Sequence, residues 1–76
     1  MQEKIAELLK EINGKDTVPD FDADLFANDM LDSLGVAQLV AALEDTLGIE
    51  IDPEDILPEN FSTINEIDAL VQKYKA

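Results

Sequence analysis

Residues 32–48 read DSLGVAQLVAALEDTLG, and this stretch decides the fold of the chain. Its larger apolar residues recur at the spacing of one helix face, at Val36, Leu39, Val40, Leu43 and Leu47. Asp32 and Ser33 are residue types whose side-chain oxygens accept N–H groups of a first helical turn, and Gly48 is a typical C-terminal stop. The stretch therefore predicts a helix over about residues 33–47, with the Ser33 hydroxyl near solvent at or just before its N-terminus.

The serine at this helix start has two interpretations. A helix N-terminus offers free N–H groups and partial positive charge, which suit a phosphate. Ser33 is therefore either an attachment point for a phosphorylated group or, like most serines in such positions, a plain cap. The rest of the chain has to decide between these two roles.

Three further segments have helical patterns. Residues 2–13 carry one apolar face, made of Ile5, Leu8, Leu9 and Ile12. A short helix is expected over residues 53–57, where Pro58 would end it. Thr63 and Glu66 have the spacing of a capping box, which opens the last helix.

The connection over residues 14–32 is long for such a small chain. Pro19 and several aspartates argue against a regular helix there, whereas its apolar residues indicate that it is ordered and packed. We expect an all-α fold over residues 1–76, a single small four-helix bundle with three longer helices, one short helix and this long loop. Its interior is expected to be lined by Leu8, Ile12, Leu39, Leu43, Leu47, Ile51, Ile56, Ile67 and Leu70.

The chain is strongly acidic. It has 18 Asp and Glu residues against 5 Lys, which gives a formal net charge of −13. Contacts to phosphate need Lys and Arg, so nucleic acid is excluded as a partner, and anionic membrane surfaces would repel the chain. Basic patches on other proteins are the natural partners, and simple solubility is the plainer explanation of the acidity.

Residue types suited to catalysis are scarce. The chain has no Cys and no His, which excludes thiolate nucleophiles, thiolate zinc sites and Ser-His-Asp arrangements. A chain of 76 residues leaves little room for a deep substrate cleft, so we do not expect an enzyme. We find no signal peptide and no apolar run that could span a membrane, and we expect a cytoplasmic monomer without membrane insertion.

A calcium site is the main competing hypothesis. Asp20, Asp22 and Asp24 match positions 1, 3 and 5 of an EF-hand loop. That loop needs Gly at its sixth position and Glu at its twelfth, where this chain has Leu25 and Leu31. We therefore expect no specific metal site, and an acidic calcium-binding or protein-binding module is the alternative of another class.

Leu34 lies off the apolar stripe of its helix. An exposed leucine beside an exposed serine suits the docking of a partner protein. The alternative is that Leu34 packs under the connection formed by residues 14–32.

Residues 31–34, LDSL, open an amphipathic helix after a long loop and resemble the acyl carrier proteins and related carrier domains. The resemblance covers nearly the whole chain, including LEDTLGI at 43–49 and FSTI at 61–64. It implies that Ser33 receives 4′-phosphopantetheine from coenzyme A and that the thiol of this arm carries an acyl group as a thioester. It also implies that Asp32 helps the transferase dock or holds its metal ion. The recognition face would be formed by Leu34, Val36, Ala37, Gln38, Glu44 and Asp45.

Two kinds of cargo are compatible with this resemblance. Gly35 stands where fatty-acid carriers usually have a polar or acidic residue, and the Asp-Ser-x-Gly start is similar to D-alanyl carrier proteins of Gram-positive cell-wall modification. Those carriers usually have a tryptophan before the last helix, which this chain lacks, and residues 59–64 are closer to general acyl or peptidyl carriers. Glycine in a first helical turn also suggests a close approach of the arm or of a partner.

We therefore expect a carrier of acyl intermediates between enzymes of fatty-acid or related biosynthesis. A D-alanyl or aminoacyl carrier for teichoic acid modification is the alternative. The expected partners are a phosphopantetheinyl transferase and acyl-processing or acyl-loading enzymes with basic docking patches.

Overall fold

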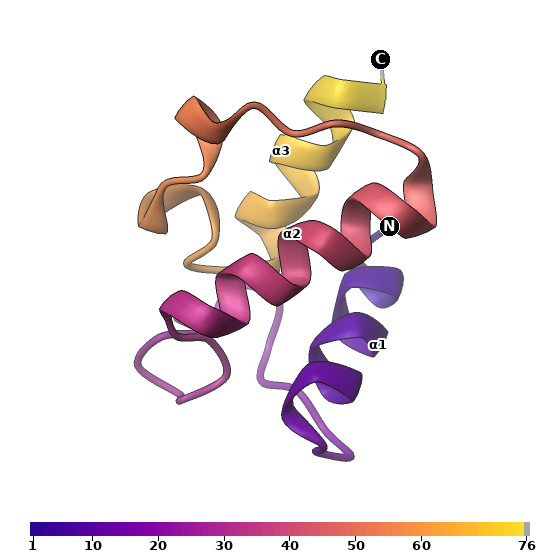
Figure 1. The fold of residues 1–76 in the computed structure, drawn as a ribbon. Coiled ribbons are helices and arrows are strands. Elements are labelled where there is room, and N and C mark those ends of the chain that lie inside the picture. The colour runs from indigo at the N-terminus through magenta and orange to yellow at the C-terminus, as the bar shows by residue number, and fades with distance from the viewer. Residues whose placement is uncertain (76) are drawn as a thin grey trace.

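Helix α2 (Ser33–Leu47) crosses the front of the molecule in Figure 1. The other α-helices are α1 (Gln2–Asn13) and α3 (Ile64–Lys75), and α1 contacts both α2 and α3. The computed structural model describes residues 1–75, and every regular element within them is helical, which confirms the all-α class. No helix of this described part is long and apolar enough to cross a membrane.

Glycines end α1 and α2, and Gly48 is the stop that the sequence predicts for α2. Gly14 has φ 65° and donates its N–H to the Lys10 carbonyl, and Gly48 has φ 66° and donates to the Glu44 carbonyl. Glycine suits this left-handed conformation because it has no Cβ to clash with the backbone.

The single short helix expected over residues 53–57 is not confirmed. The chain instead forms two 3-10 turns, η1 (Pro53–Asp55) and η2 (Pro58–Asn60). Pro58 has no N–H to extend the first turn, and its ring disfavours a helical conformation of Leu57, which is extended with φ −116° and ψ 146°. Residues 1–75 therefore contain three α-helices and two turns, and the four-helix count is not confirmed.

The core is formed by the three α-helices and by the connections between them. The expected core residues that are buried are Leu8, Leu39, Leu43, Ile51, Ile67 and Leu70. Ile12, Leu47 and Ile56 are only half-buried and pack at the edge of the core. The core also takes in residues that helical spacing did not indicate, namely Leu25, Met30, Leu31 and Phe61 from the connections.

The connection between α1 and α2 is ordered and packed, as its apolar residues predict. The backbone N–H of Leu25 donates to the carbonyl of Ser62 at 2.7 Å, and the N–H of Asn65 donates to the carbonyl of Phe21 at 3.0 Å. These two bonds fasten the connection to the start of α3. The connection that leads into α2 is thus held by residues around the start of α3, far away in the sequence.

Thr63 opens α3 as expected, but the capping box is only half formed. Thr63 Oγ1 accepts the N–H of Glu66 at 3.0 Å. The Glu66 carboxylate accepts the hydroxyl of Ser62 at 2.6 Å, where a full capping box would have it accept the backbone N–H of Thr63. The hydroxyl of Ser62 is therefore engaged at the start of this helix.

The last turn of α3 holds η1 through charged and polar side chains. Lys73 Nζ lies 3.1 Å from the Asp55 carboxylate, and the Tyr74 hydroxyl donates to the same carboxylate. The hydrogen bond from Tyr74, followed by that from Lys73, lowers the pKa of Asp55 below its ordinary value of 3.8. The hydrogen bonds to Asp55 raise the pKa of Lys73 above 10.5 and the pKa of Tyr74 above 10.0.

We expect Asp55→Asn to be less stable than the wild type only within a window of pH. Folding lowers the pKa of Asp55, so its stabilisation is present above the unfolded value of 3.8 and is lost as pH falls through the folded value. Folding raises the pKa of Lys73 and of Tyr74. Their contribution to stability is therefore present below about pH 10 and is lost as pH rises through the folded pKa values. Urea unfolding between about pH 3 and about pH 11 measures the difference in free energy of unfolding.

The control is Asp16→Asn, which removes the same charge from an exposed position in the connection after α1. This control should show no comparable window. The loss of free energy of unfolding in Asp55→Asn, relative to the wild type, should shrink as the solution is acidified from about pH 5 to about pH 3. A loss that grows over this range would contradict the stabilising role of the Asp55 carboxylate.

Candidate functional site

Ser33 is the first residue of α2, and it is exposed. The residue before it, Asp32, is the N-cap, with an extended backbone and its Oδ1 accepting the N–H of Gly35 at 2.7 Å. The capping role that the sequence left open for Ser33 therefore belongs to Asp32. Ser33 is exposed at the helix N-terminus, as expected.

Gly35 is explained by the same turn. A Cβ at this position would lie 3.2 Å from Asp32 Oδ1 and 3.3 Å from Leu31 Cδ2, which is tighter than ordinary contact. The sequence suggested that glycine at this position allows the arm or a partner to approach closely. The structure instead places two side chains of this molecule, those of Asp32 and Leu31, against this position. Glycine accommodates the capping carboxylate, although it costs up to about 1 kcal/mol in helix propensity relative to alanine.

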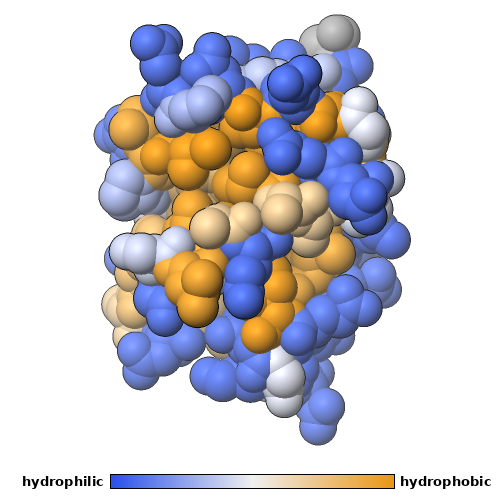
Figure 2. All heavy atoms as spheres, in the orientation of Figure 1, coloured by the Kyte–Doolittle hydropathy of each residue, from blue (hydrophilic) through white to orange (hydrophobic). Residues whose placement is uncertain are grey.

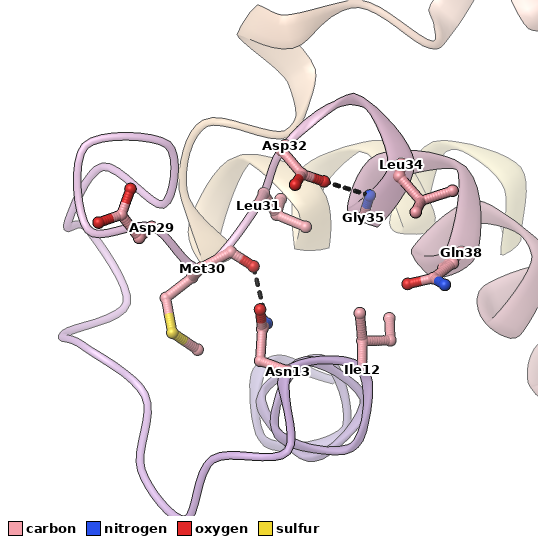
Figure 3. A pocket seen from close by; sticks show the side chains of 9 residues that line it. All are labelled: Ile12, Asn13, Asp29, Met30, Leu31, Asp32, Leu34, Gly35 and Gln38. Carbon is pink, nitrogen blue, oxygen red and sulfur yellow. Dashed lines mark hydrogen bonds between the residues drawn. The ribbon is translucent and has the colours of Figure 1, made fainter.

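Asn13, the last residue of α1, positions the chain just before Asp32. Its side-chain amide donates to the carbonyl of Met30 at 2.7 Å (Figure 3) and also to that of Leu9 at 3.0 Å. The N–H of Met30 donates in turn to the Leu25 carbonyl at 2.8 Å. The sequence indicates only that Asn13 ends the first helix, because helical spacing says nothing about a contact between residues 17 positions apart.

A polar hollow of about 150 Å³ lies between the end of α1 and the start of α2. Figure 3 shows Asp29, Asp32 and Gln38 around it, and Ser33 is not among its lining residues. Asp29 has φ 58°, a left-handed conformation that is uncommon outside glycine but tolerated by Asp. The bend at Asp29 leads the connection into the start of α2.

A second hollow, of about 220 Å³, includes Ser33 in its lining. We call it the apolar hollow, and its lining residues are Phe26, Ser33, Val36, Ile56, Leu57 and Pro58. Apart from the serine, all of them are apolar. A group attached to Ser33 would therefore have an apolar surface directly beside it.

Several residues of the expected recognition face are exposed on α2. Leu34 is 68% exposed, so the alternative in which it packs under the connection is wrong. Ala37, Gln38 and Asp45 are also exposed. Figure 2 shows apolar residues in the middle of the face that carries α2 in Figure 1, with hydrophilic residues around its edges.

The other two residues of that face have internal roles. Val36 is half-buried and lines the apolar hollow. Glu44 is also half-buried, and its Oε2 accepts the N–H of Ile51 at 3.0 Å. Glu44 therefore fixes the course of the chain after α2, a role that its place on an acidic helix end did not reveal.

One of the acids in the EF-hand-like stretch has a local role. Asp24 Oδ1 accepts the N–H of Phe26 at 2.9 Å and that of Ala27 at 3.1 Å, which closes a turn. Among residues 1–75, no group of three or more His, Cys, Asp or Glu side chains is arranged to hold a metal ion.

An exposed serine at a capped helix start, beside an apolar hollow, agrees with the family to which this chain is matched. The family is described as a phosphopantetheine attachment site, and its model matches residues 3–71. The chain belongs to this family, which confirms 4′-phosphopantetheine as its prosthetic group. Membership also implies interaction with a transferase and with enzymes that process the carried group.

Curated relatives of the chain are D-alanyl carrier proteins. The chain is 34% identical to the one from Lactococcus lactis subsp. lactis (strain IL1403) over 76 residues, which cover 99% of this chain and 96% of the relative. It is 35% identical to the one from Enterococcus faecalis (strain ATCC 700802 / V583) over 68 residues, with coverages of 88% and 87%. The similarity to D-alanyl carriers noted at the Asp-Ser-x-Gly start is thus confirmed, whereas a role in fatty-acid biosynthesis is not.

Proposed function

We propose that the chain is a single carrier domain, over residues 1–76, whose Ser33 carries the 4′-phosphopantetheine arm. Three observations support this assignment: the residue is exposed, it opens α2, and Asp32 already caps the helix. Ser33 Oγ forms a bond to phosphorus while the bond from that phosphorus to the adenosine bisphosphate of coenzyme A breaks, and a base of the transferase takes the hydroxyl proton. The arm supplies the thiol that holds the cargo as a thioester, so a chain without Cys can act as a carrier without being an enzyme.

The surroundings of Ser33 suit this modification. Free N–H groups of the first turn of α2 favour the negative charge of a phosphodiester. One carboxylate oxygen of Asp32 is bound to Gly35, and we propose that the other helps the transferase dock. The apolar hollow provides a surface on which the arm can lie.

We propose that partner enzymes dock on the exposed face of α2. Leu34, Ala37 and Gln38 form its neutral centre, with Asp45 at one end and Val36 at the border of the apolar hollow. Partners would present an apolar centre surrounded by basic residues. Glu44 is left out of this face because its side chain is half-buried, unlike that of the exposed Asp32, and its Oε2 accepts the Ile51 N–H.

The cargo that we favour is a D-alanyl group. The observation that carries this choice is the similarity to D-alanyl carrier proteins over nearly the full length of both chains. A D-alanyl thioester has an ammonium group, which has no partner in the apolar hollow and would stay in solvent. A general acyl cargo is the second candidate, because the apolar hollow offers about 0.8 kcal/mol for each methylene it buries.

The test uses the protein after attachment of the arm. A ligase that activates D-alanine with ATP for a carrier is offered this chain and, as a matched control, a fatty-acid carrier protein. We expect kcat/KM at least tenfold higher for this chain, which corresponds to about 1.4 kcal/mol of transition-state discrimination. The measurement is the increase in intact mass with time.

The same pair of carriers is then offered to a fatty-acyl synthetase with octanoate. If the fatty-acyl synthetase prefers the fatty-acid carrier to this chain, the result supports the D-alanyl assignment. The opposite result is that this chain is loaded with octanoate as efficiently as the fatty-acid carrier and is loaded with D-alanine no more efficiently than that carrier. In that case the general acyl cargo replaces the D-alanyl cargo.

A further inference from the structure

The segment that joins α2 to α3 has little apolar anchoring in its middle. We call residues 49–63 the α2–α3 link, which crosses over α3 in Figure 1. Ile51 and Phe61, near its two ends, are buried, but neither η1 nor η2 contains a buried residue. Between the two turns, Ile56 is half-buried and Leu57 is 41% exposed. The position of the middle of the link therefore depends in large part on polar contacts, with Ile56 as its one apolar contact to the core.

Tyr74 supplies these contacts from the last turn of α3. Its hydroxyl accepts the N–H of Asp52 at 3.0 Å and donates to the carboxylate of Asp55. The carbonyl of Asp55 accepts the side-chain amide of Asn60 at 2.8 Å, which connects η1 to η2. One hydroxyl group thus binds η1 directly and is connected to η2 through Asn60, and Lys73 adds a contact at 3.1 Å to Asp55 alone.

The same segment forms one wall of the apolar hollow. Ile56, Leu57 and Pro58 follow Asp55 directly, and they line the hollow together with Ser33 and residues of the opposite side. Because this wall is weakly buried, its distance from Ser33 follows from where Asp55 is held. Tyr74 is not itself a lining residue, so any effect on the hollow has to pass through the link.

We propose that Tyr74 is a positioning residue whose hydroxyl holds the link against the apolar hollow and so restricts which groups attached to Ser33 can enter it. The restriction on cargo rests on the proposed function, in which Ser33 carries the arm. The connection from Tyr74 to the wall of the hollow does not rest on the proposed function, because it is a property of the protein without the arm.

Tyr74→Phe tests the connection, because it keeps the half-buried ring and removes only the hydroxyl. Amide hydrogen exchange is measured on the unloaded protein, residue by residue. We expect exchange at least tenfold faster at the amides of Asp55 and Ile56, which are bonded within η1, and unchanged exchange at Leu9 in α1. We also expect the signals of the Ser33 amide and the Val36 methyl groups to shift, although neither residue is near Tyr74 in the sequence.

Lys73→Met is the matched control, because it removes a neighbouring contact to Asp55 and leaves the Tyr74 hydroxyl in place. Its exchange rates in η1 should change less than threefold. Equal exchange in Tyr74→Phe and the wild type overturns the proposal. So does faster exchange by one common factor along the whole chain, since this would mean general destabilisation.

The effect on cargo is measured after loading an octanoyl group onto the arm. In Tyr74→Phe the loading should move the Val36 methyl signals at least twice as far as it does in the wild type. The wall formed by the link is no longer held by the Tyr74 hydroxyl, so more of the octanoyl group can enter the apolar hollow. Equal movement overturns the restriction on cargo. A chain that cannot be loaded at Ser33 overturns the proposed function and this restriction together, while the exchange experiment still decides the role of Tyr74.

Discussion

Ser33→Ala is expected to abolish the attachment of phosphopantetheine while leaving the helical circular dichroism spectrum nearly unchanged. The hydroxyl oxygen is the atom that would bond to phosphorus, and no other group at the start of α2 offers an equivalent nucleophile. The fold should persist because Asp32 caps the helix and the Ser33 side chain is exposed. The measurement is intact mass after incubation with coenzyme A and a phosphopantetheinyl transferase, which rises by one phosphopantetheine only in the wild type.

Ser62→Ala is the matched control, since Ser62 is the only other serine of the chain. Its hydroxyl donates to the Glu66 carboxylate at 2.6 Å, so it is engaged at the start of α3. This variant should be loaded as the wild type is. The assignment would be falsified by a wild-type mass that stays constant under conditions that load a known carrier.

Phe61→Ala should have the largest effect on stability. Phe61 is 0% exposed and is among the largest fully buried side chains of the described residues. Truncation of a buried phenylalanine costs about 3–5 kcal/mol, and a chain of this length has a total stability of roughly 4–11 kcal/mol. We therefore expect a variant that is largely unfolded or close to it, as measured by urea unfolding and near-ultraviolet circular dichroism.

Phe26→Ala makes the same chemical change at a half-buried position. It should cost clearly less, because part of the ring is already in contact with water and its removal leaves a smaller cavity. Similar losses for the two variants would show that Phe61 has no special place in the core.

The helices were predictable because each has an apolar face of regular spacing and a recognisable end. α1, α2 and α3 begin and end within a residue of the predicted positions where these were given. The importance of Phe61 was not predictable, because a single aromatic residue between turns has no periodicity. The two prolines of the α2–α3 link were visible in the sequence, but the same pattern fits one short helix or two 3-10 turns.

The candidate site was predictable in part. The exposure of Ser33 followed from the residue types at the start of α2, yet Asp and Ser are both good caps, and only the structure assigns the cap to Asp32. The role of Glu44 depends on a contact to Ile51 across the turn after α2. The amide of Asn13 binds the carbonyl of Met30, a backbone group whose position no sequence pattern indicates.

The charge of the molecule is separated from the neutral centre of the surface that is proposed to meet partners. Residues 33–43 of α2 contain no Asp, Glu or Lys, although the whole chain carries a net charge of −13. Distant charges act mainly on the rate of encounter and are screened over about 10 Å at moderate salt. Neutral contacts act mainly on the rate of dissociation, which salt changes little. Ionic strength would thus govern how often this carrier meets an enzyme, whereas Leu34 and its neutral neighbours would govern how long it stays.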